Sequence, residues 1–258
     1  MVHQNGQLCG PRSGFRGTQR RRWRTRDRKT ALEGDRQPMS SKEYFDEVAS
    51  QWDEMRETFF SEAVRQKAYA VADVQPGKLA ADIGAGSGFV TAGLIEKGLR
   101  VIAVDQSEVM LAEMRNRFPE AATIDYRVGR AESLPLDSDT ADYVFANMYL
   151  HHVEFPAKAI GEMVRILKPG GRLVITDLDE HGFEFLRTEQ YDRWLGFKRE
   201  DVQGWLSAAG LQGVATDCVG EDCCAQSQCG TQAASVSIFV AYGEKALAPA
   251  DAGKRQGG

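Results

Sequence analysis

The sequence predicts a doubly wound α/β fold built on a Rossmann-like sheet. Two observations support this prediction. Short apolar segments of strand length alternate with helix-like segments between residues 79 and 242, which is the pattern of a sheet covered by helices on both faces. The first strand also ends in a glycine-rich turn, D-I-G-A-G-S-G at residues 82–88, of the kind that joins a strand to a ligand-binding helix.

The expected elements follow one another in a regular order. Strands are predicted near residues 79–83, 100–105, 123–127, 142–147, 171–177, 213–219 and 234–242, and helices near residues 88–98, 107–117, 156–167 and 198–209. Ahead of them, Ser40 or Ser41 is placed to cap one amphipathic helix, and a second helix covers residues 61–74. Ligands of such sheets bind beyond the carboxyl ends of the strands, so residues that follow the strands are expected to meet at one edge.

The glycine run and a second acid predict an adenosine-containing cofactor. Alternate glycines allow a tight turn and a close approach of the backbone to a ligand. Asp105 ends the next strand, 23 residues after Asp82, and a carboxylate there can accept both hydroxyls of a ribose. The order D-x-G-x-G-x-G differs from the pyrophosphate-binding order G-x-G-x-x-G. Asp82 would repel a pyrophosphate, whereas it suits a ligand with an ammonium and a sulfonium group, such as S-adenosylmethionine.

Together with two later segments, this run resembles the class I S-adenosylmethionine-dependent methyltransferases. G-R-A-E-S-L-P at residues 129–135 is similar to the family's G-x-A-E-x-L-P segment, and L-K-P-G-G at residues 167–171 matches its turn before the fifth strand. The histidine pair at 151–152 is similar to that of the small-molecule subgroup, with its ubiquinone/menaquinone-type and arsenite-type members. The resemblance implies six parallel strands, an antiparallel last strand beside the fifth, and N-terminal lid helices over cofactor and acceptor.

The same resemblance implies which residues bind the methyl donor, S-adenosyl-L-methionine. These residues are Asp82, Gly84, Ala85, Gly86, Gly88, Asp105, Gln106, Ala131, Glu132 and Asn147. The glycine loop is expected to wrap the methionine moiety, and Asp105 to hold the ribose. The amide of Ala131 and the side chain of Glu132 are expected to border the adenine, and the segment that begins at Asn147 to lie beneath the transferable methyl group.

Residues after the fourth and fifth strands are candidates for catalysis and acceptor binding. His151 or His152 is predicted to accept a proton from the acceptor, because imidazole titrates near neutral pH. The alternative is that one of the two histidines only fixes the loop. The polar and aromatic segment 177–197 is typical of a binding pocket, and within it His181 and Trp194 are predicted to bind the acceptor. The acceptor is expected to be a small molecule, whose identity the sequence leaves open.

A metal site is not predicted. Asp177, Asp179 and His181 form the alternative, a set of residues that offers metal ligands after the fifth strand. Methyl transfer from a sulfonium needs no Lewis acid unless the acceptor is a catechol-like diol, so we expect none here.

Four cysteines crowd into residues 218–229, at and after the end of the strand predicted near 213–219, and the loop from there to the last strand is predicted to lie on the cofactor edge. In that loop Cys223 and Cys224 would bind a thiophilic element, because thiolates are soft ligands. An arsenite methyltransferase is therefore an alternative to the more general small-molecule enzyme. Surface thiols without a catalytic role are the competing interpretation.

Charge divides the chain into a basic tail and an acidic domain. Residues 1–38 carry a net charge of +7, which leaves −12 for the rest. We expect residues 1–38 to be disordered and not part of the native domain, with a natural start at Met39. The methyltransferase domain is predicted to span residues 39–243, with lid helices at 40–74, and residues 244–258 to form a flexible C-terminal tail.

The same features bear on partners and location. No nucleic-acid partner is expected, because the domain is acidic and N-M-Y-L at residues 147–150 replaces the D/N-P-P-Y/F motif of base methylation. The sequence has no apolar run of about 18 residues, so no membrane span is predicted. An apolar segment of the secretory type does not follow the basic N-terminus either. We therefore expect a cytoplasmic protein.

Two other function classes compete with methyl transfer. A nicotinamide oxidoreductase would share the first strand and Asp105, but it would need G-x-G-x-x-G spacing and would leave the later motifs unexplained. A non-catalytic S-adenosylmethionine-binding regulatory protein is the stronger alternative, because binding motifs do not prove turnover.

Overall fold

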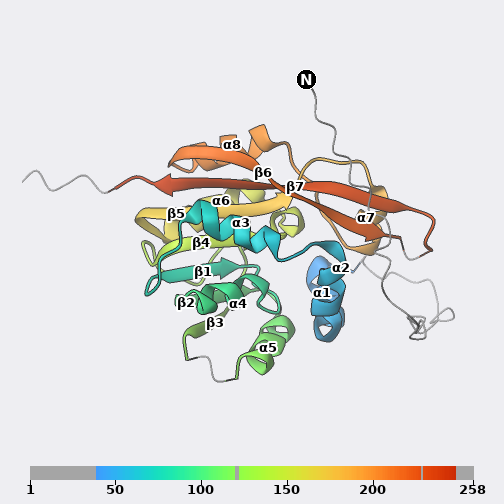
Figure 1. Ribbon diagram of the computed structural model, residues 1–258, viewed down its shortest axis with the longest axis horizontal. Coiled ribbons are helices and arrows are strands. Elements are labelled where there is room, and N and C mark those ends of the chain that lie inside the picture. Colours follow the sequence, from blue (N-terminus) through green and yellow to red (C-terminus); the bar gives the residue numbers. More distant parts are fainter. Residues whose placement is uncertain (1–38, 120–121, 228, 248–258) are drawn as a thin grey trace, which may run out of the picture. The chain divides into compact units, whose positions relative to one another are not determined.

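A computed structural model describes residues 39–119, 122–227 and 229–247. Its seven-stranded sheet has the order β3-β2-β1-β4-β5-β7-β6 (Figure 1). The strands are β1 (Leu79–Ile83), β2 (Arg100–Asp105), β3 (Ile124–Val128), β4 (Ala141–Asn147), β5 (Leu167–Leu178), β6 (Leu211–Gln226) and β7 (Ala233–Lys245). Strands β1 to β5 pair in parallel, and β7 is antiparallel to both of its neighbours, β5 and β6. The predicted fold class and topology are confirmed.

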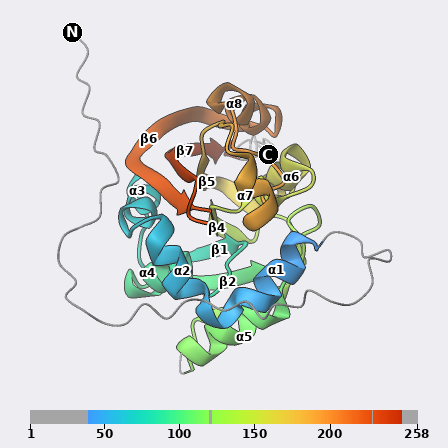
Figure 2. The ribbon, with the colours of Figure 1, turned by 90° about the vertical axis from the view of Figure 1, so that its right-hand side faces the viewer.

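Helices cover both faces of this sheet. They are α1 (Ser41–Val48), α2 (Trp52–Phe59), α3 (Ala63–Ala72), α4 (Phe89–Glu96), α5 (Glu108–Arg117), α6 (Pro156–Ile166), α7 (Glu184–Glu189) and α8 (Arg199–Ala208). Buried side chains of α3 and α4 form one core cluster with the sheet, and those of α6 and α8 form another on the opposite face (Figure 2). Among the described residues, no helix is long and apolar enough to cross a membrane.

The N-terminal helices lie at the functional edge of the sheet. Figure 1 shows α1, α2 and α7 beyond the end toward which the β1 and β5 arrows point. Ser40 caps α1 in a reciprocal capping box with Glu43, as expected for one of the two predicted caps. The single helix predicted after Ser40 is wrong in one respect, because a 3-10 turn at Ala49–Gln51 separates α1 from α2. This break places two short helices over the edge.

The predicted cysteine loop is also wrong. Residues 211–226 form the long strand β6, which pairs with β7 in a hairpin that extends past the end of β5 in Figure 1. The sequence predicts a strand only near residues 213–219, but the structure continues it to Gln226 with an irregularity in register between Cys218 and Asp222. Pairing with β7 therefore overrides the local signal, as is common for strands. The last strand reaches Lys245, so the first two residues of the tail predicted at 244–258 belong to β7 instead, and residues 1–38 and 248–258 lie outside the described residues.

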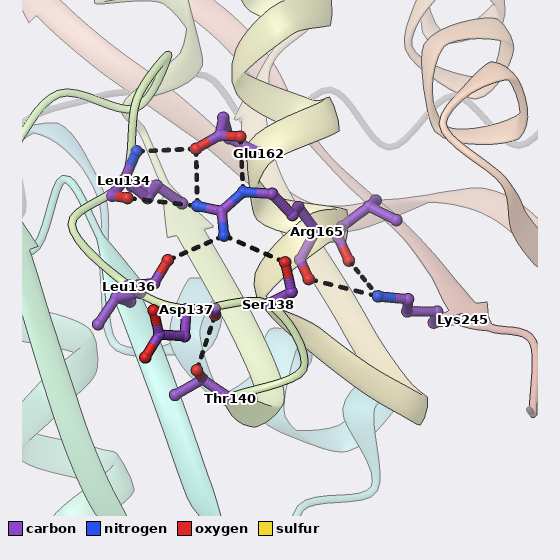
Figure 3. Close-up of polar contacts among 9 residues, drawn as sticks. Leu134, Leu136, Asp137, Ser138, Thr140, Glu162, Arg165 and Lys245 are labelled. Carbon is purple, nitrogen blue, oxygen red and sulfur yellow. Dashed lines mark hydrogen bonds and ion pairs between the residues drawn. The ribbon is translucent and has the colours of Figure 1, made fainter.

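A polar network joins the connection between β3 and β4 to the end of α6, and the end of α6 to the end of β7 (Figure 3). Arg165, near the end of α6, binds both carboxylate oxygens of Glu162 at 2.7 and 2.8 Å. Its guanidinium also donates to the carbonyl groups of Leu134 and Leu136 at 3.2 and 2.8 Å. Lys245 at the end of β7 donates to carbonyl groups at the end of α6, including that of Val164 at 3.0 Å. One arginine thus fixes the loop that carries the A-E-x-L-P motif.

We expect Arg165→Met to lower the free energy of unfolding by about 1–3 kcal/mol, because it leaves partly buried carbonyl and carboxylate groups without a charged donor. Urea unfolding monitored by circular dichroism measures this change. Arg127→Met is the matched control, since Arg127 forms only an exposed pair with Asp125 on β3, and it should change stability by less than about 1 kcal/mol. Equal effects of the two substitutions would contradict the anchoring role.

Candidate functional site

A pocket of about 680 Å³ lies at the carboxyl edge of the sheet, beneath the lid helices. Its floor comes from the turns after β1, β2 and β4, as the topology of an open parallel sheet requires. Eight of the predicted cofactor residues belong to these turns, and seven of the eight line the pocket: Asp82, Gly84, Ala85, Gly86, Asp105, Gln106 and Asn147. Its roof comes from lid side chains, among them Phe45, Trp52 and Arg56.

The eighth residue, Gly88, has a packing role instead. A Cβ there would lie 2.9 Å from atoms of Met114 and Phe118, so glycine lets α5 approach the start of α4. Gly84 and Gly86 also have positive φ angles, of 70° and 53°, which L-residues rarely adopt. A Cβ on Gly84 would lie 2.2 Å from the ring of Tyr149. The turn therefore keeps backbone, not side chains, in the pocket.

Two buried carboxyl groups face the pocket. Asp82 accepts a hydrogen bond from the Thr91 hydroxyl at 2.7 Å, and its burial raises its pKa to about 7. Asp105 accepts from the backbone amides of Gly86 and Ser107, both at 2.9 Å, and burial raises its pKa as well. Each Asp105 oxygen keeps a lone pair for a further donor. Because desolvation disfavours both anions, a cationic or hydroxyl-bearing ligand would stabilise them.

The two residues predicted at the adenine lie outside the lining of this pocket. Ala131 and Glu132 are both buried, and Glu132 pairs with Arg130 at 3.6 Å. Tyr149, at the end of β4, lines the pocket in their stead, and the Ala131 backbone hydrogen-bonds to its side chain. Burial raises the pKa of Tyr149, so its hydroxyl is neutral. Contact of Ala131 and Glu132 with a cofactor stays a prediction.

The lid is attached to the pocket floor by polar contacts. Asp46 of α1 accepts a hydrogen bond from the Ser107 hydroxyl, next to the acid that ends β2. Asp53 of α2 accepts from Ser87 in the glycine loop at 2.7 Å and pairs with Arg117 at 2.9 Å. Both helices are thereby held against the turns that they cover.

A second pocket of about 480 Å³ adjoins the first. The two share lining residues, namely Phe45, Trp52, Phe60, Met148 and His152. The rest of the second pocket is mostly apolar, with Phe59, Leu178, Leu186 and Ala225, and its polar members are His151, Gln190, Asp192 and Cys223. Two ligands, one in each pocket, would therefore come into contact beside these shared side chains.

His151 is a buried cation held between two carboxylates. Its Nδ1 lies 2.7 Å from Asp177 Oδ1, and its Nε2 lies 3.8 Å from Asp192. Burial alone would lower the pKa of His151, but these two carboxylates raise it to about 9. Its backbone carbonyl accepts the amides of Arg193 and Trp194, each at 3.0 Å. His151 thus ties β5 to the segment that follows α7.

His152 has the opposite electrostatic character. Burial and the neighbouring His151 cation hold the pKa of His152 well below its ordinary value. Its Nδ1 lies 3.3 Å from the Tyr191 carbonyl oxygen, so Nδ1 carries the proton and Nε2 is left as an acceptor. Its ring packs edge-on against Phe45 of the lid, at 5.0 Å between centroids. A neutral imidazole therefore stands where the two pockets join.

Comparisons with known proteins agree with this geometry. Residues 81–175 match a family model described as a methyltransferase domain. An uncharacterized methyltransferase of Mycobacterium tuberculosis is 44% identical over 92 residues, 36% of each chain. A demethylmenaquinone methyltransferase of Renibacterium salmoninarum is 32% identical over 157 residues, which make up 60% of this chain and 65% of that protein. Residues 81–175 of this chain are therefore similar to a methyltransferase domain.

A solved structure supports the fold of this methyltransferase domain. Phosphoethanolamine N-methyltransferase 2 from Haemonchus contortus, in complex with S-adenosyl-L-methionine, superposes with a TM-score of 0.65 at 17% identity, covering 81% of this chain and 60% of that one. The chain spans between about a third and two thirds of the length of the curated relatives above. The family resemblance inferred from the motifs is confirmed.

Two residues predicted to bind the acceptor lie outside both pockets of the methyltransferase domain. The Trp194 indole donates to the Val153 carbonyl at 2.8 Å and is 41% exposed. The His181 ring accepts the Phe183 amide at Nδ1. Both side chains thus brace the segment that surrounds the second pocket.

The cysteine pair is divided by strand geometry. Cys223 lines the second pocket, whereas Cys224, the next residue of β6, is not among the side chains that line it. Successive strand residues point to opposite faces of a sheet. Burial, with Asp192 and Asp177, raises the pKa of Cys223 to about 12, so the thiol is protonated. The structure therefore does not bring the two sulfur atoms together as a chelating pair.

The residues considered as metal ligands are also separated. Asp179 forms a two-point ion pair with Arg199, at 2.7 and 2.6 Å, and Asp177 binds His151. Donor atoms of His151, His152 and Asp192 lie within 4.8 Å of one another instead. A cation could enter there only after His151 lost the proton that it holds between two carboxylates. We therefore treat this cluster as a proton-carrying group.

We expect Gly84→Ala to destabilise the domain by at least about 1 kcal/mol, since alanine is strained at positive φ and its methyl group overlaps Tyr149. Gly204→Ala is the control, because Gly204 lies in α8 with open space around it. That change should stabilise the protein by about 0.5–1 kcal/mol. Thermal unfolding of the two variants measures both effects, and a stable Gly84→Ala protein would refute the close contact with Tyr149.

Proposed function

We propose that this protein transfers a methyl group from S-adenosylmethionine to a small-molecule acceptor. The observation that carries the proposal is the pair of adjoining pockets at the carboxyl edge, with His152 at their junction. The first pocket is the more polar of the two and contains two acids, whereas the second is largely apolar. Such a division suits a charged donor and a less polar acceptor that react where the pockets meet.

The first pocket fits the proposed donor. When bound, S-adenosylmethionine supplies an electrophilic methyl group on a sulfonium. Asp82 offers a buried carboxylate for the ammonium group, and the glycine loop leaves room for the methionine chain against the backbone. Asp105 keeps lone pairs for the ribose hydroxyls while two backbone amides hold it in place.

The second pocket supports roles for the chain's own residues in transfer. Phe45 and Trp52 of the lid exclude water and border both pockets, so they hold an acceptor in line with the donor. His152 Nε2 accepts a proton from an acceptor hydroxyl as the new bond forms. His151 does not exchange that proton, because Asp177 and Asp192 hold it in the charged form; it positions the loop and keeps His152 neutral.

The proposal is tested by incubating the full chain with methyl-labelled S-adenosylmethionine and a panel of phenols, quinols, thiols and arsenite. Label should appear on at least one acceptor. His152→Gln should lower kcat for a hydroxyl acceptor by about 10²–10⁴-fold, because it removes the base, and leave donor binding unchanged. His181→Gln is the control, since that ring lies outside both pockets. Tight donor binding with no transfer to any acceptor would favour the regulatory alternative.

The proposed roles also predict the pH dependence of kcat/KM. His152 stays neutral through the neutral range, so at saturating donor, where the bound ammonium group keeps Asp82 ionised, the profile for the acceptor should show no break from His152 near 6.5, the ordinary value for histidine. Activity should fall as pH rises through about 9, where His151 loses its proton and leaves two buried carboxylates without their cation.

Asp192→Asn tests the origin of that fall. Removing one carboxylate should lower the pKa of His151 and move the alkaline limb down by about one pH unit. Asp125→Asn, an exposed change on β3, should leave the profile in place. An alkaline limb that Asp192→Asn does not move would show that His151 is not the group that titrates.

A further inference from the structure

Arg56 is a buried cation that lines the first pocket and that none of the roles above uses. It lies on α2, and its side chain is 6% exposed. The guanidinium carbon stands 4.1 Å from the centre of the Phe89 ring and 5.7 Å from that of Phe60. Aromatic rings therefore cover the flat face of the cation, and Arg56 lines the first pocket.

The protein gives this cation few partners. Among the described residues, Arg56 Nε has no hydrogen-bond acceptor. Within the described part of the chain its one ion pair is with Glu57, at 3.8 Å, and that carboxylate is 72% exposed; Asp53 and Glu62 act on the cation only through their charges, without an ion pair. Burial without a matched anion is unfavourable for a guanidinium, so the arrangement suits an anion that comes from outside the chain.

A neighbouring arginine has two protein contacts that Arg56 lacks, although its Nε, like that of Arg56, has no acceptor among the described residues. Arg65 of α3 also lies over the Phe89 ring, at 5.0 Å. Its Nη1 donates to the Phe89 carbonyl at 2.6 Å, it pairs with Glu62, and it does not line the pocket. Arg56 has neither contact, although it is the more deeply buried of the two.

We propose that Arg56 binds the α-carboxylate of the methyl donor and makes the pocket selective for a donor with an intact amino-acid end. This inference rests on the proposed function. Asp82 and Arg56 line the same pocket as opposite charges, which is what a zwitterionic α-amino acid requires. A planar guanidinium can bind a carboxylate through two parallel hydrogen bonds. The contact would also join α2 of the lid to the donor.

The experiment compares S-adenosylmethionine with its decarboxylated analogue, which lacks only that anion, by isothermal titration calorimetry. The full-length wild-type protein should bind the analogue about 10- to 100-fold more weakly. Arg56→Met should lose about the same factor for S-adenosylmethionine and for S-adenosylhomocysteine, and little for the analogue. Arg56→Lys should recover part of the loss. Arg65→Met should keep the wild-type preference, since it removes a cation from the same ring but not from the pocket.

Each outcome has one meaning. If the wild-type protein binds S-adenosylmethionine and its decarboxylated analogue equally well, the inference is wrong. This comparison needs no substitution, so it decides the matter even if Arg56→Met folds poorly. A substitution that weakens all three ligands equally, with a lower melting temperature, also overturns it and assigns Arg56 to packing on Phe89. Wild-type protein that binds no S-adenosylmethionine refutes the proposed function itself. Selective binding without methyl transfer supports the carboxylate contact and refutes only the proposed turnover.

Discussion

The buried ion pair between Asp177 and His151 organises the side of the domain that bears the second pocket. Asp177 ends β5 with no exposed surface, and it accepts both the ring and the backbone amide of His151, at 2.7 and 3.3 Å. A buried carboxylate of this kind needs a matched cation, since removing one partner of such a pair is strongly destabilising. The histidine that meets this need then fixes the segment after α7 through its carbonyl group.

The same pair determines the chemistry of the next residue. The two adjacent imidazoles are not both positively charged, because their rings lie 4.1 Å apart and each charge disfavours the other. Asp177 and Asp192 assign the charge to His151, so His152 is neutral and presents a lone pair where the pockets join. The two histidines of one short motif thus take unlike roles, which is how environment separates groups of the same type.

Features that depend on neighbouring residues along the chain can be predicted from the sequence. The strands that end at Ile83 and Asp105 have the predicted bounds, and the residues of the glycine loop meet Asp105 at one edge because parallel topology requires it. Arg56 and Tyr149 were missed, since nothing in their neighbourhood along the chain reveals that a distant turn covers them. The sequence predicts the first half of β6, near residues 213–219, and places the second half in a loop, because only pairing with the distant β7 continues the strand to Gln226.

The lid is the element that couples the two pockets. Phe45 and Trp52 border both of them, and their rings pack edge to face at 5.0 Å. Asp46 and Asp53 fasten the same two helices to the turns after β2 and β1. A lid held in this way cannot open over one pocket and stay closed over the other without breaking the aromatic contact. Access to the two pockets is therefore linked, and a ligand that orders the lid over the first also completes the apolar wall of the second.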